Sequence, residues 1–196
     1  MSLKNYTIVI SGLGGQGLIK LLQILGNAFL INGYEVITSE THGLSQRGGK
    51  VTCFLRLGNK LNSPIPMVGS ADMIIALEES SILDALKFAK PNKSTKIIIS
   101  TYEKQVLGVE YPSLKYILDT LYEISDFIYV IPLTDIALKH TRQVKTMNGV
   151  LLGYILKFLA IDKRYIEKSL SDNFSGSILD LNLKAFNAGL KLWEDY

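Results

Sequence analysis

The sequence predicts an α/β fold in which a mostly parallel, Rossmann-like sheet lies between two layers of helices, a three-layer α/β/α sandwich. Short apolar segments rich in β-branched residues alternate along the chain with segments whose apolar residues recur every three to four positions. This alternation is typical of βαβ units, which build parallel sheets covered on both faces. The 196 residues suffice for a sizeable core, so we expect residues 1–196 to form a single domain.

A glycine turn separates the first two predicted elements. Tyr6–Ser11 is an apolar, β-branched run, which favours a buried strand. The turn Gly12–Gly17 follows it at once, and from Leu18 the apolar residues fall on one helical face until Gly33 ends the helix. Tyr34–Ser39 is the next predicted strand, and these elements together form a βαβ unit.

The remaining segments continue the alternation. We expect strands at Val51–Leu57, Met73–Leu77, Lys96–Thr101 and Phe127–Ile131, and helices at Ser80–Ala89, Leu114–Ile124, Met147–Ala160, Asp162–Ser171 and Leu181–Trp193, with a further helix starting over Thr134–Lys139. Ser80 or Ser81, and Thr134, are the expected N-caps of their helices. Gly58-Asn59-Lys60 indicates a turn into a short second arm, so a Val51–Leu61 hairpin would contribute an antiparallel strand.

Charge and cysteine content exclude several classes of site. The chain carries 21 Lys and Arg against 18 Asp and Glu, a formal net charge of +3, which is too small and too evenly spread to indicate nucleic-acid binding. The single cysteine, Cys53, lies in an apolar run, which indicates a small buried hydrophobe in a reducing compartment. One thiol cannot form an intrachain disulfide, nor can it alone hold a zinc ion or an iron–sulfur cluster.

No segment predicts export or membrane insertion. The first apolar run, Tyr6–Ile10, is five residues long and ends at glycines, unlike the core of a signal peptide. The longest apolar stretch, Gly149–Ile161, contains Lys157 and is too short to span a bilayer. We therefore expect a cytoplasmic protein that does not insert into membranes.

The glycine turn is the first candidate binding site, and it comprises Gly12, Gly14, Gly15, Gln16 and Gly17. It has the pattern GxGxxG directly between a strand and a helix. Glycines tolerate positive φ and let a ligand approach the backbone, while the first-turn amides and the helix dipole attract an anion. Glu40 lies 23 residues after Gly17, near where dinucleotide-binding folds place a ribose-binding acid. Three interpretations stay open: a nicotinamide or flavin nucleotide, another phosphate or carboxylate, or glycines that only permit tight packing.

The second candidate is the polar loop that follows the second predicted strand. Residues Thr38–Gly49 concentrate hydrogen-bonding side chains among glycines at the carboxyl end of a strand, where open α/β sheets bind ligands. The side chains expected to contact a ligand or a neighbouring subunit are Glu40, His42, Ser45, Gln46 and Arg47. The alternative is a solvated polar loop. Ser45 and His42 suggest a nucleophile and a base, but no third group that would orient the base is identifiable, so no catalytic residue is assigned.

Together the two motifs resemble those of the γ-type subunit of 2-oxoacid:ferredoxin oxidoreductases. The sequence motifs of the family are matched by GLGGQG after the first strand and by TSE-x-HGLSQRGG after the second. Further matching blocks are Ser63–Pro66, Ala71-Asp72 with the strand Met73–Glu78, Met147-Asn148-Gly149, and Asn182 with Ala185-Phe186 and Gly189. The resemblance covers essentially the whole chain. HGLSQRGG, Tyr111-Pro112 and the ending Leu181–Gly189 are most similar to the β subunit of indolepyruvate:ferredoxin oxidoreductase.

The resemblance implies that the chain is the smaller subunit of an enzyme complex and is inactive alone. Such a complex oxidatively decarboxylates a 2-oxoacid, here indolepyruvate or another arylpyruvate, with coenzyme A as acyl acceptor and ferredoxin as electron acceptor. Thiamine diphosphate, Mg²⁺ and 4Fe-4S clusters are expected on a large partner subunit, since the carbanion left by decarboxylation needs an electron sink. The polar loop would complete the active-site cleft against that partner, and the glycine turn would face coenzyme A phosphates or a partner carboxylate.

Two other functions stay open at this point. One is a stand-alone oxidoreductase that binds a dinucleotide, and the other is an assembly domain without a ligand of its own. The isolated chain is also expected to self-associate through the face that it would offer to a partner, because large exposed apolar patches rarely stay uncovered.

Overall fold

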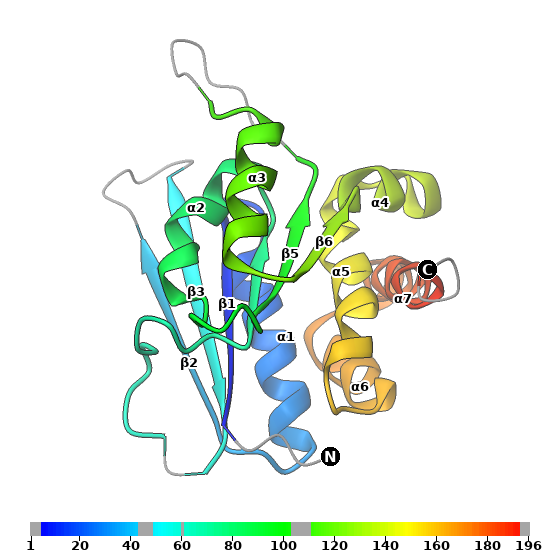
Figure 1. Ribbon diagram of the computed structural model, residues 1–196. Coiled ribbons are helices and arrows are strands. Elements are labelled where there is room, and N and C mark those ends of the chain that lie inside the picture. The colour runs from blue at the N-terminus through cyan, green and yellow to red at the C-terminus, as the bar shows by residue number, and fades with distance from the viewer. Residues whose placement is uncertain (1–4, 43–48, 60, 103–110, 193–196) are drawn as a thin grey trace.

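Helices cover both faces of a mixed sheet in the computed structural model, which describes residues 5–42, 49–59, 61–102 and 111–192 (Figure 1). The sheet has the strand order β2-β3-β1-β4-β5-β6. Its strands are β1 (Tyr6–Leu13), β2 (Val36–His42), β3 (Lys50–Leu57), β4 (Met73–Ala76), β5 (Lys96–Ser100) and β6 (Phe127–Ile131). β1, β4, β5 and β6 pair in parallel, whereas β3 runs antiparallel to both β1 and β2. The predicted layered α/β fold with an antiparallel strand is confirmed.

The antiparallel strand has different partners from those of the predicted hairpin. β3 inserts between β2 and β1 and pairs along its whole length with β1, from Tyr6 opposite Leu57 to Leu13 opposite Lys50. The expected second arm after Gly58 is irregular in its described residues. β3 is buried on both faces, which suits a central strand better than one arm of an edge hairpin. The same pairing carries β2 through His42, beyond the predicted end at Ser39.

The helices are α1 (Leu18–Ile31), α2 (Ile82–Ala85), α3 (Leu114–Ile124), α4 (Leu133–Thr141), α5 (Met147–Ile155), α6 (Lys163–Asn173) and α7 (Gly176–Lys191). The predicted helix over 80–89 breaks into α2 flanked by 3₁₀ turns, and α5 passes into another 3₁₀ turn after Ile155. Ser81 occupies the N-cap position of α2, as predicted, but its side chain makes no capping bond. In the preceding 3₁₀ turn the Glu78 side chain accepts the capping bond from Ser81 N. The cap predicted at Thr134 is wrong, because Thr134 lies inside α4, which begins directly after Pro132.

Alternate residues of the central strands pack into two hydrophobic clusters, one on each face of the sheet. Ile8 and Ile10 of β1 pack under α1 and the α4–α7 layer, whereas Val9 packs under α2 and α3 on the opposite face (Figure 1). This period of two is what a strand buried on both faces requires. Among the described helices, none is long and apolar enough to cross a membrane.

α5 and α7 pack with their backbones in contact. A Cβ atom placed on Gly153 would lie 2.1 Å from Phe186 O, and one on Gly189 would lie 2.0 Å from Val150 O. Only glycine leaves space for such an approach. The contact fixes the position of the N-terminal turn of α5, which carries Asn148, over the carboxyl end of β1.

Candidate functional site

The glycine turn lies at the point where the connections of the sheet diverge. From β1 the chain crosses through α1 to β2 at one edge, while β4, β5 and β6 extend the sheet toward the other edge. Open α/β sheets bind ligands in the crevice outside the carboxyl ends of the strands at such a point. The turn therefore occupies the position in the fold that favours a binding site.

The backbone of the turn is partly committed to bonds within the protein. Gly12 and Leu13 belong to β1, so the turn itself spans Gly14–Gly17, with positive φ at Gly15 (95°) and Gly17 (77°). Gly14 N donates to Gly49 O at 2.9 Å, and Gln16 N donates to Leu13 O at 3.2 Å. The first bond of α1 runs from Leu21 N to Gly17 O. The amides ahead of Leu21 have no intrahelical acceptor, and such amides at a helix N-terminus favour an anion.

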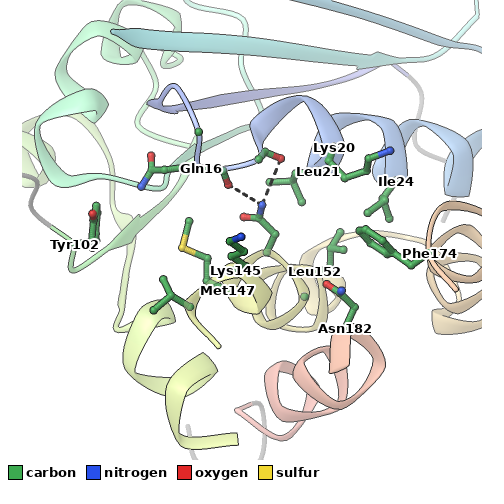
Figure 2. A pocket seen from close by; sticks show the side chains of 15 residues that line it. Gln16, Lys20, Leu21, Ile24, Tyr102, Lys145, Met147, Leu152, Phe174 and Asn182 are labelled. Carbon is green, nitrogen blue, oxygen red and sulfur yellow. Dashed lines mark hydrogen bonds between the residues drawn. The ribbon is translucent and has the colours of Figure 1, made fainter. Parts of the chain in front are cut away.

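Two side-chain amides hold the turn. Gln16 Oε1 accepts from Leu13 N at 2.7 Å, and its Nε2 donates to Leu77 O at the end of β4 at 3.0 Å. Asn148, on α5, donates from Nδ2 to Gln16 O at 2.9 Å and to Gly17 O at 3.3 Å (Figure 2). The turn is therefore fixed both to the neighbouring strand and to the helical layer above it.

The glycines of the turn leave space for these side chains as well as for a ligand. A Cβ on Gly12 would lie 2.7 Å from Gln16 Oε1, and a Cβ on Gly17 would lie 2.9 Å from Asn148 Nδ2. At Gly15, by contrast, no atom lies within 4 Å of the Cβ position. Of the three, Gly15 is thus where a ligand can approach the backbone, while Gly12 and Gly17 make room for protein amides.

A cavity of about 390 Å³ lies between the turn, α1 and the N-terminal halves of α5 and α7 (Figure 2). Its polar lining comes from Gln16, Lys20, Tyr102, Lys145, Asn148 and Asn182, and its apolar lining from Leu21, Ile24, Val144, Met147, Leu152 and Phe174, with backbone from Gly15, Gly17 and Gly149. No acidic residue is among these lining residues.

The charges around the cavity favour an anion. Lys20 and Lys145 are the lysines of its lining, and the N-terminus of α1 adds the positive end of a helix dipole. Lys20 Nζ donates to Asn173 Oδ1 at 3.3 Å, which holds its ammonium group at the α6 side of the cavity. Leu21, Ile24 and Leu152 provide an apolar wall beside these cations. The arrangement suits a phosphorylated molecule that also has a less polar part.

The sheet places Glu40, the first of the candidate side chains in the polar loop, away from this cavity. Glu40 pairs with Cys53 on β3, and Cys53 pairs with Ile10 on β1, so two strand spacings, about 10 Å, separate Glu40 from β1. In a dinucleotide-binding fold the strand with the ribose-binding acid lies directly beside β1. The inserted β3 removes that adjacency, which argues against the dinucleotide interpretation of the glycine turn.

The other predicted loop residues are only partly covered by the structure. His42 is the last residue of β2 and pairs with Val51. Ser45, Gln46 and Arg47 lie outside the described residues. Glu40 also acts on the core, since burial and, to a smaller extent, the Glu40 charge raise the pKa of the Cys53 thiol to about 12. Cys53 is therefore an inert buried thiol, as the sequence predicts.

Comparison with known proteins gives the family. The pattern of the family described as pyruvate ferredoxin/flavodoxin oxidoreductase matches residues 7–192. The chain belongs to this family. The resemblance noted in the sequence is thereby confirmed over nearly the whole chain.

Relatives within the family carry a common name. Indolepyruvate oxidoreductase subunit IorB of Archaeoglobus fulgidus is 33% identical over 190 residues, 93% of this chain and 92% of the relative. The subunit of the same name from Methanothermobacter thermautotrophicus is 32% identical over 192 residues, 94% and 96% of the two chains. Both relatives are therefore similar to this chain from end to end.

A solved structure has the same fold. The 2-oxoglutarate:ferredoxin oxidoreductase of Magnetococcus marinus, with 2-oxoglutarate, coenzyme A and succinyl-CoA bound, superimposes with a TM-score of 0.76 at 23% identity. The superposition covers 100% of this chain but 32% of that longer chain. About one third of that longer chain thus has the architecture found here.

The described residues of this family member offer no set of ligands for the metal ions or iron–sulfur clusters of ferredoxin-linked enzymes. Among these residues no three His, Cys, Asp or Glu side chains come together to hold a metal ion. The whole sequence has one cysteine, Cys53, and it is buried in the core. A 4Fe-4S cluster bound by four thiolates cannot be built from it.

Sequence reasoning found the turn but missed most of the residues around it. Tyr102 and Lys145 reach the cavity from segments far along the chain, and no local pattern marks them. Asn148 had one signal, since a polar residue stands in the first turn of a strongly apolar helix. Glu78 was also missed: its buried carboxylate accepts from Ser80 Oγ and Ser81 N at 2.9 Å, and its Oε1 has no hydrogen-bond partner among the described residues.

Proposed function

We propose that this chain is the smaller subunit of a cytoplasmic, ferredoxin-dependent 2-oxoacid oxidoreductase of the indolepyruvate or arylpyruvate type. The observation that carries the proposal is the end-to-end similarity to subunits named indolepyruvate oxidoreductase IorB. The complex would convert a 2-oxoacid, coenzyme A and two oxidised ferredoxins into acyl-CoA, carbon dioxide, a proton and two reduced ferredoxins. The chain is one γ-type domain that completes the active site and is inactive alone.

The cofactors of this reaction are assigned to a large partner subunit. Thiamine diphosphate with its Mg²⁺ supplies the electron sink for decarboxylation, and 4Fe-4S clusters carry the electrons to ferredoxin. The single buried cysteine of this chain supports the placing of the clusters on the partner. Substrate specificity would accordingly depend mainly on residues of the partner, with this chain closing the cleft.

The cavity at the glycine turn is proposed to receive coenzyme A. Lys20 and Lys145 would neutralise its phosphates, and the open backbone at Gly15 would let a phosphate approach the N-terminus of α1. The apolar wall of Leu21, Ile24 and Leu152 would contact the less polar part of the molecule. Coenzyme A and succinyl-CoA in the Magnetococcus marinus enzyme support the choice of ligand.

The polar loop is proposed to meet the partner subunit. Glu40 is exposed on β2, an edge strand of the sheet that ends at His42, and Ser45, Gln46 and Arg47 follow in the sequence. An edge strand ending in a polar, glycine-rich segment gives a partner both backbone and side-chain groups to bind.

Co-expression with a large subunit that has thiamine- and cluster-binding sequence motifs tests the function. The expected result is a co-purified complex that reduces ferredoxin with indolepyruvate or another arylpyruvate and requires coenzyme A. A chain that stays separate from that subunit would contradict the proposal. A chain that alone binds a flavin or titrates with NADH, detected by absorbance and fluorescence, would support the stand-alone oxidoreductase instead.

Two variants of the complex test the assigned surfaces. Gly15→Val forces a β-branched residue into φ 95° and closes the open backbone, so the KM for coenzyme A should rise. The matched control for Gly15→Val is Gly33→Val, because Gly33 also has a positive φ and open space but lies far from the cavity, after α1. In the polar loop, Arg47→Ala should weaken assembly or turnover. Normal coenzyme A dependence in a folded Gly15→Val complex would leave packing as the role of the turn.

A further inference from the structure

Asn148 holds the last peptide unit of the glycine turn, between Gln16 and Gly17, directly before the first carbonyl that the helix holds. Gly17 O already accepts the first α-helical bond, from Leu21 N. In the described part of the chain, the bond that holds Gln16 O comes from Asn148 Nδ2, 132 residues further along the chain, at 2.9 Å. A second bond, from Asn148 Nδ2 to Gly17 O at 3.3 Å, brings the same amide nitrogen against both carbonyls, and the dashed lines of Figure 2 mark the two bonds.

The orientation of the Asn148 amide is dictated by its surroundings. Rotation of the amide by 180° would place Oδ1 against two carbonyl oxygens, so the donor nitrogen must face the turn. Oδ1 is then buried and has no hydrogen-bond partner among the described residues. An unpaired buried acceptor is costly, and the side chain stays there because its nitrogen is needed at the turn.

The hydrogen bond from Asn148 to Gln16 O also sets the direction of the Gly17 N–H. In a trans peptide the C=O of one residue and the N–H of the next point in opposite directions, so fixing Gln16 O fixes the Gly17 N–H. Gly17 is left-handed, and glycine changes its φ at little cost. Without Asn148 the peptide unit between Gln16 and Gly17 is free to flip, and the N–H at the start of α1 loses its direction.

We propose that Asn148 is a positioning residue for the anionic co-substrate, acting through the peptide unit between Gln16 and Gly17. This inference rests on the proposed function, in which coenzyme A occupies the cavity. Asn148 need not touch the ligand. It keeps the N-terminus of α1 in the conformation that receives a phosphate, and it couples that conformation to the position of α5.

Asn182 provides a matched control within the same cavity. It has the same side chain, it also lines the cavity, and its Nδ2 donates to Ile178 O within its own helix at 2.9 Å. A change at Asn182 removes an amide from the cavity wall without touching the glycine turn.

The test compares Asn148→Leu, Asn148→Asp and Asn182→Leu in the assembled complex. For Asn148→Leu we expect the KM for coenzyme A to rise about tenfold, the loss of about one hydrogen bond, while kcat stays within about threefold. Asn148→Asp should raise the KM further, because a carboxylate then faces two carbonyl oxygens. Asn182→Leu removes an amide of the cavity wall without releasing the glycine turn, so it should raise the KM clearly less than Asn148→Leu does. Equal KM effects of the two leucine variants, or none, would overturn the proposal.

A second measurement separates this proposal from the function on which it rests. Hydrogen exchange followed by mass spectrometry on a peptide spanning residues 14–21 should be faster in Asn148→Leu than in Asn182→Leu, with or without the partner. Unchanged exchange in Asn148→Leu overturns the positioning role even if the complex is active. If no complex forms, the proposed function fails, and the exchange of the purified chain still decides whether Asn148 holds the turn.

Discussion

Gln16 donates a hydrogen bond from Nε2 to Leu77 O at 3.0 Å, and this bond joins the end of β1 to the end of β4 at the point where the sheet divides. Its Oε1 accepts from Leu13 N at 2.7 Å, so a single side chain satisfies one donor and one acceptor of two neighbouring strands. The carboxyl edge of the sheet is thus closed by a residue of the glycine turn itself.

Replacement of Gln16 by leucine should destabilise the chain by about 1–3 kcal/mol, because Leu13 N and Leu77 O both lose a partner. Gln16→Glu keeps the acceptor but places a carboxylate oxygen against Leu77 O, so it should also destabilise. Urea unfolding followed by circular dichroism measures both. A Gln23→Leu variant, on the outward side of α1, is the control, and equal stability of the Gln16 variants and the wild type would refute the link.

Replacement of Gly153 by alanine should destabilise the chain by about 1–3 kcal/mol, through overpacking of α5 against α7. The sign is diagnostic, because glycine-to-alanine changes inside a helix ordinarily stabilise by about 1 kcal/mol. The added methyl would lie 2.1 Å from Phe186 O, so the two helices must separate. Thermal unfolding is the measurement, with Asn187→Ala on the exposed side of α7 as the control. A raised Tm for Gly153→Ala would show that the helices are not in such close contact.

Cys53 should not react with a disulfide reagent such as Ellman's reagent at pH 8 in the native chain and should react fully in urea. Burial raises its pKa from 9.0 to about 12, so the native thiol stays protonated and stabilises the fold below about pH 9. That contribution is lost as the pH rises from 9 toward 12, because the unfolded chain releases the proton first. Burial raises the pKa of Tyr6 as well, so Cys53→Ala should remove only the thiol's share of the alkaline instability. Rapid labelling of the native chain at pH 8 would contradict the assignment.

Lys145 should account for part of the salt dependence of coenzyme A binding. Charge reversal by Lys145→Glu introduces a carboxylate into a cavity whose lining residues include no acid, so the KM for coenzyme A should rise about tenfold or more at low ionic strength. The rise should shrink as salt screens the charges. Steady-state kinetics of the complex at 0.05 and 0.5 M salt, roughly two extremes of screening, measure the effect. Lys139→Glu, on α4 away from the cavity, is the control, and equal effects of the two variants would refute the role of Lys145.

Local periodicity predicted most elements of the fold. α3 and β6 begin and end where the sequence pattern places them, because each is bounded by residues whose effect is local. The place of β3 could not be predicted in the same way. An apolar strand carries no information about which strands flank it, and its insertion between β2 and β1 is decided by packing across the whole sheet.

Only the glycine turn of the candidate site was predictable from the sequence, because it is formed by neighbouring residues. The glycine turn has a sequence signature, and its position between β1 and α1 followed from it. The roles of Gln16 and Asn148 did not, because they depend on contacts with residues 61 and 132 positions away. The placing of Glu40 beside the turn failed for the same reason, since the intervening strand comes later in the chain.

The hydrophobic cluster that joins Ile8 to the α5–α7 layer has a consequence during synthesis. Ile8 and Phe186 belong to one hydrophobic cluster, yet a ribosome adding 5–20 residues per second needs on the order of ten seconds or more to make the second after the first. During that interval α1 is made first and α4, α5 and α6 follow, so that face of the sheet is only partly covered until α7 is complete. The nascent chain should therefore depend on holding chaperones until α7 has emerged, and a stalled ribosome–chain complex ending before residue 176 should bind them more strongly than one that exposes residues 1–191.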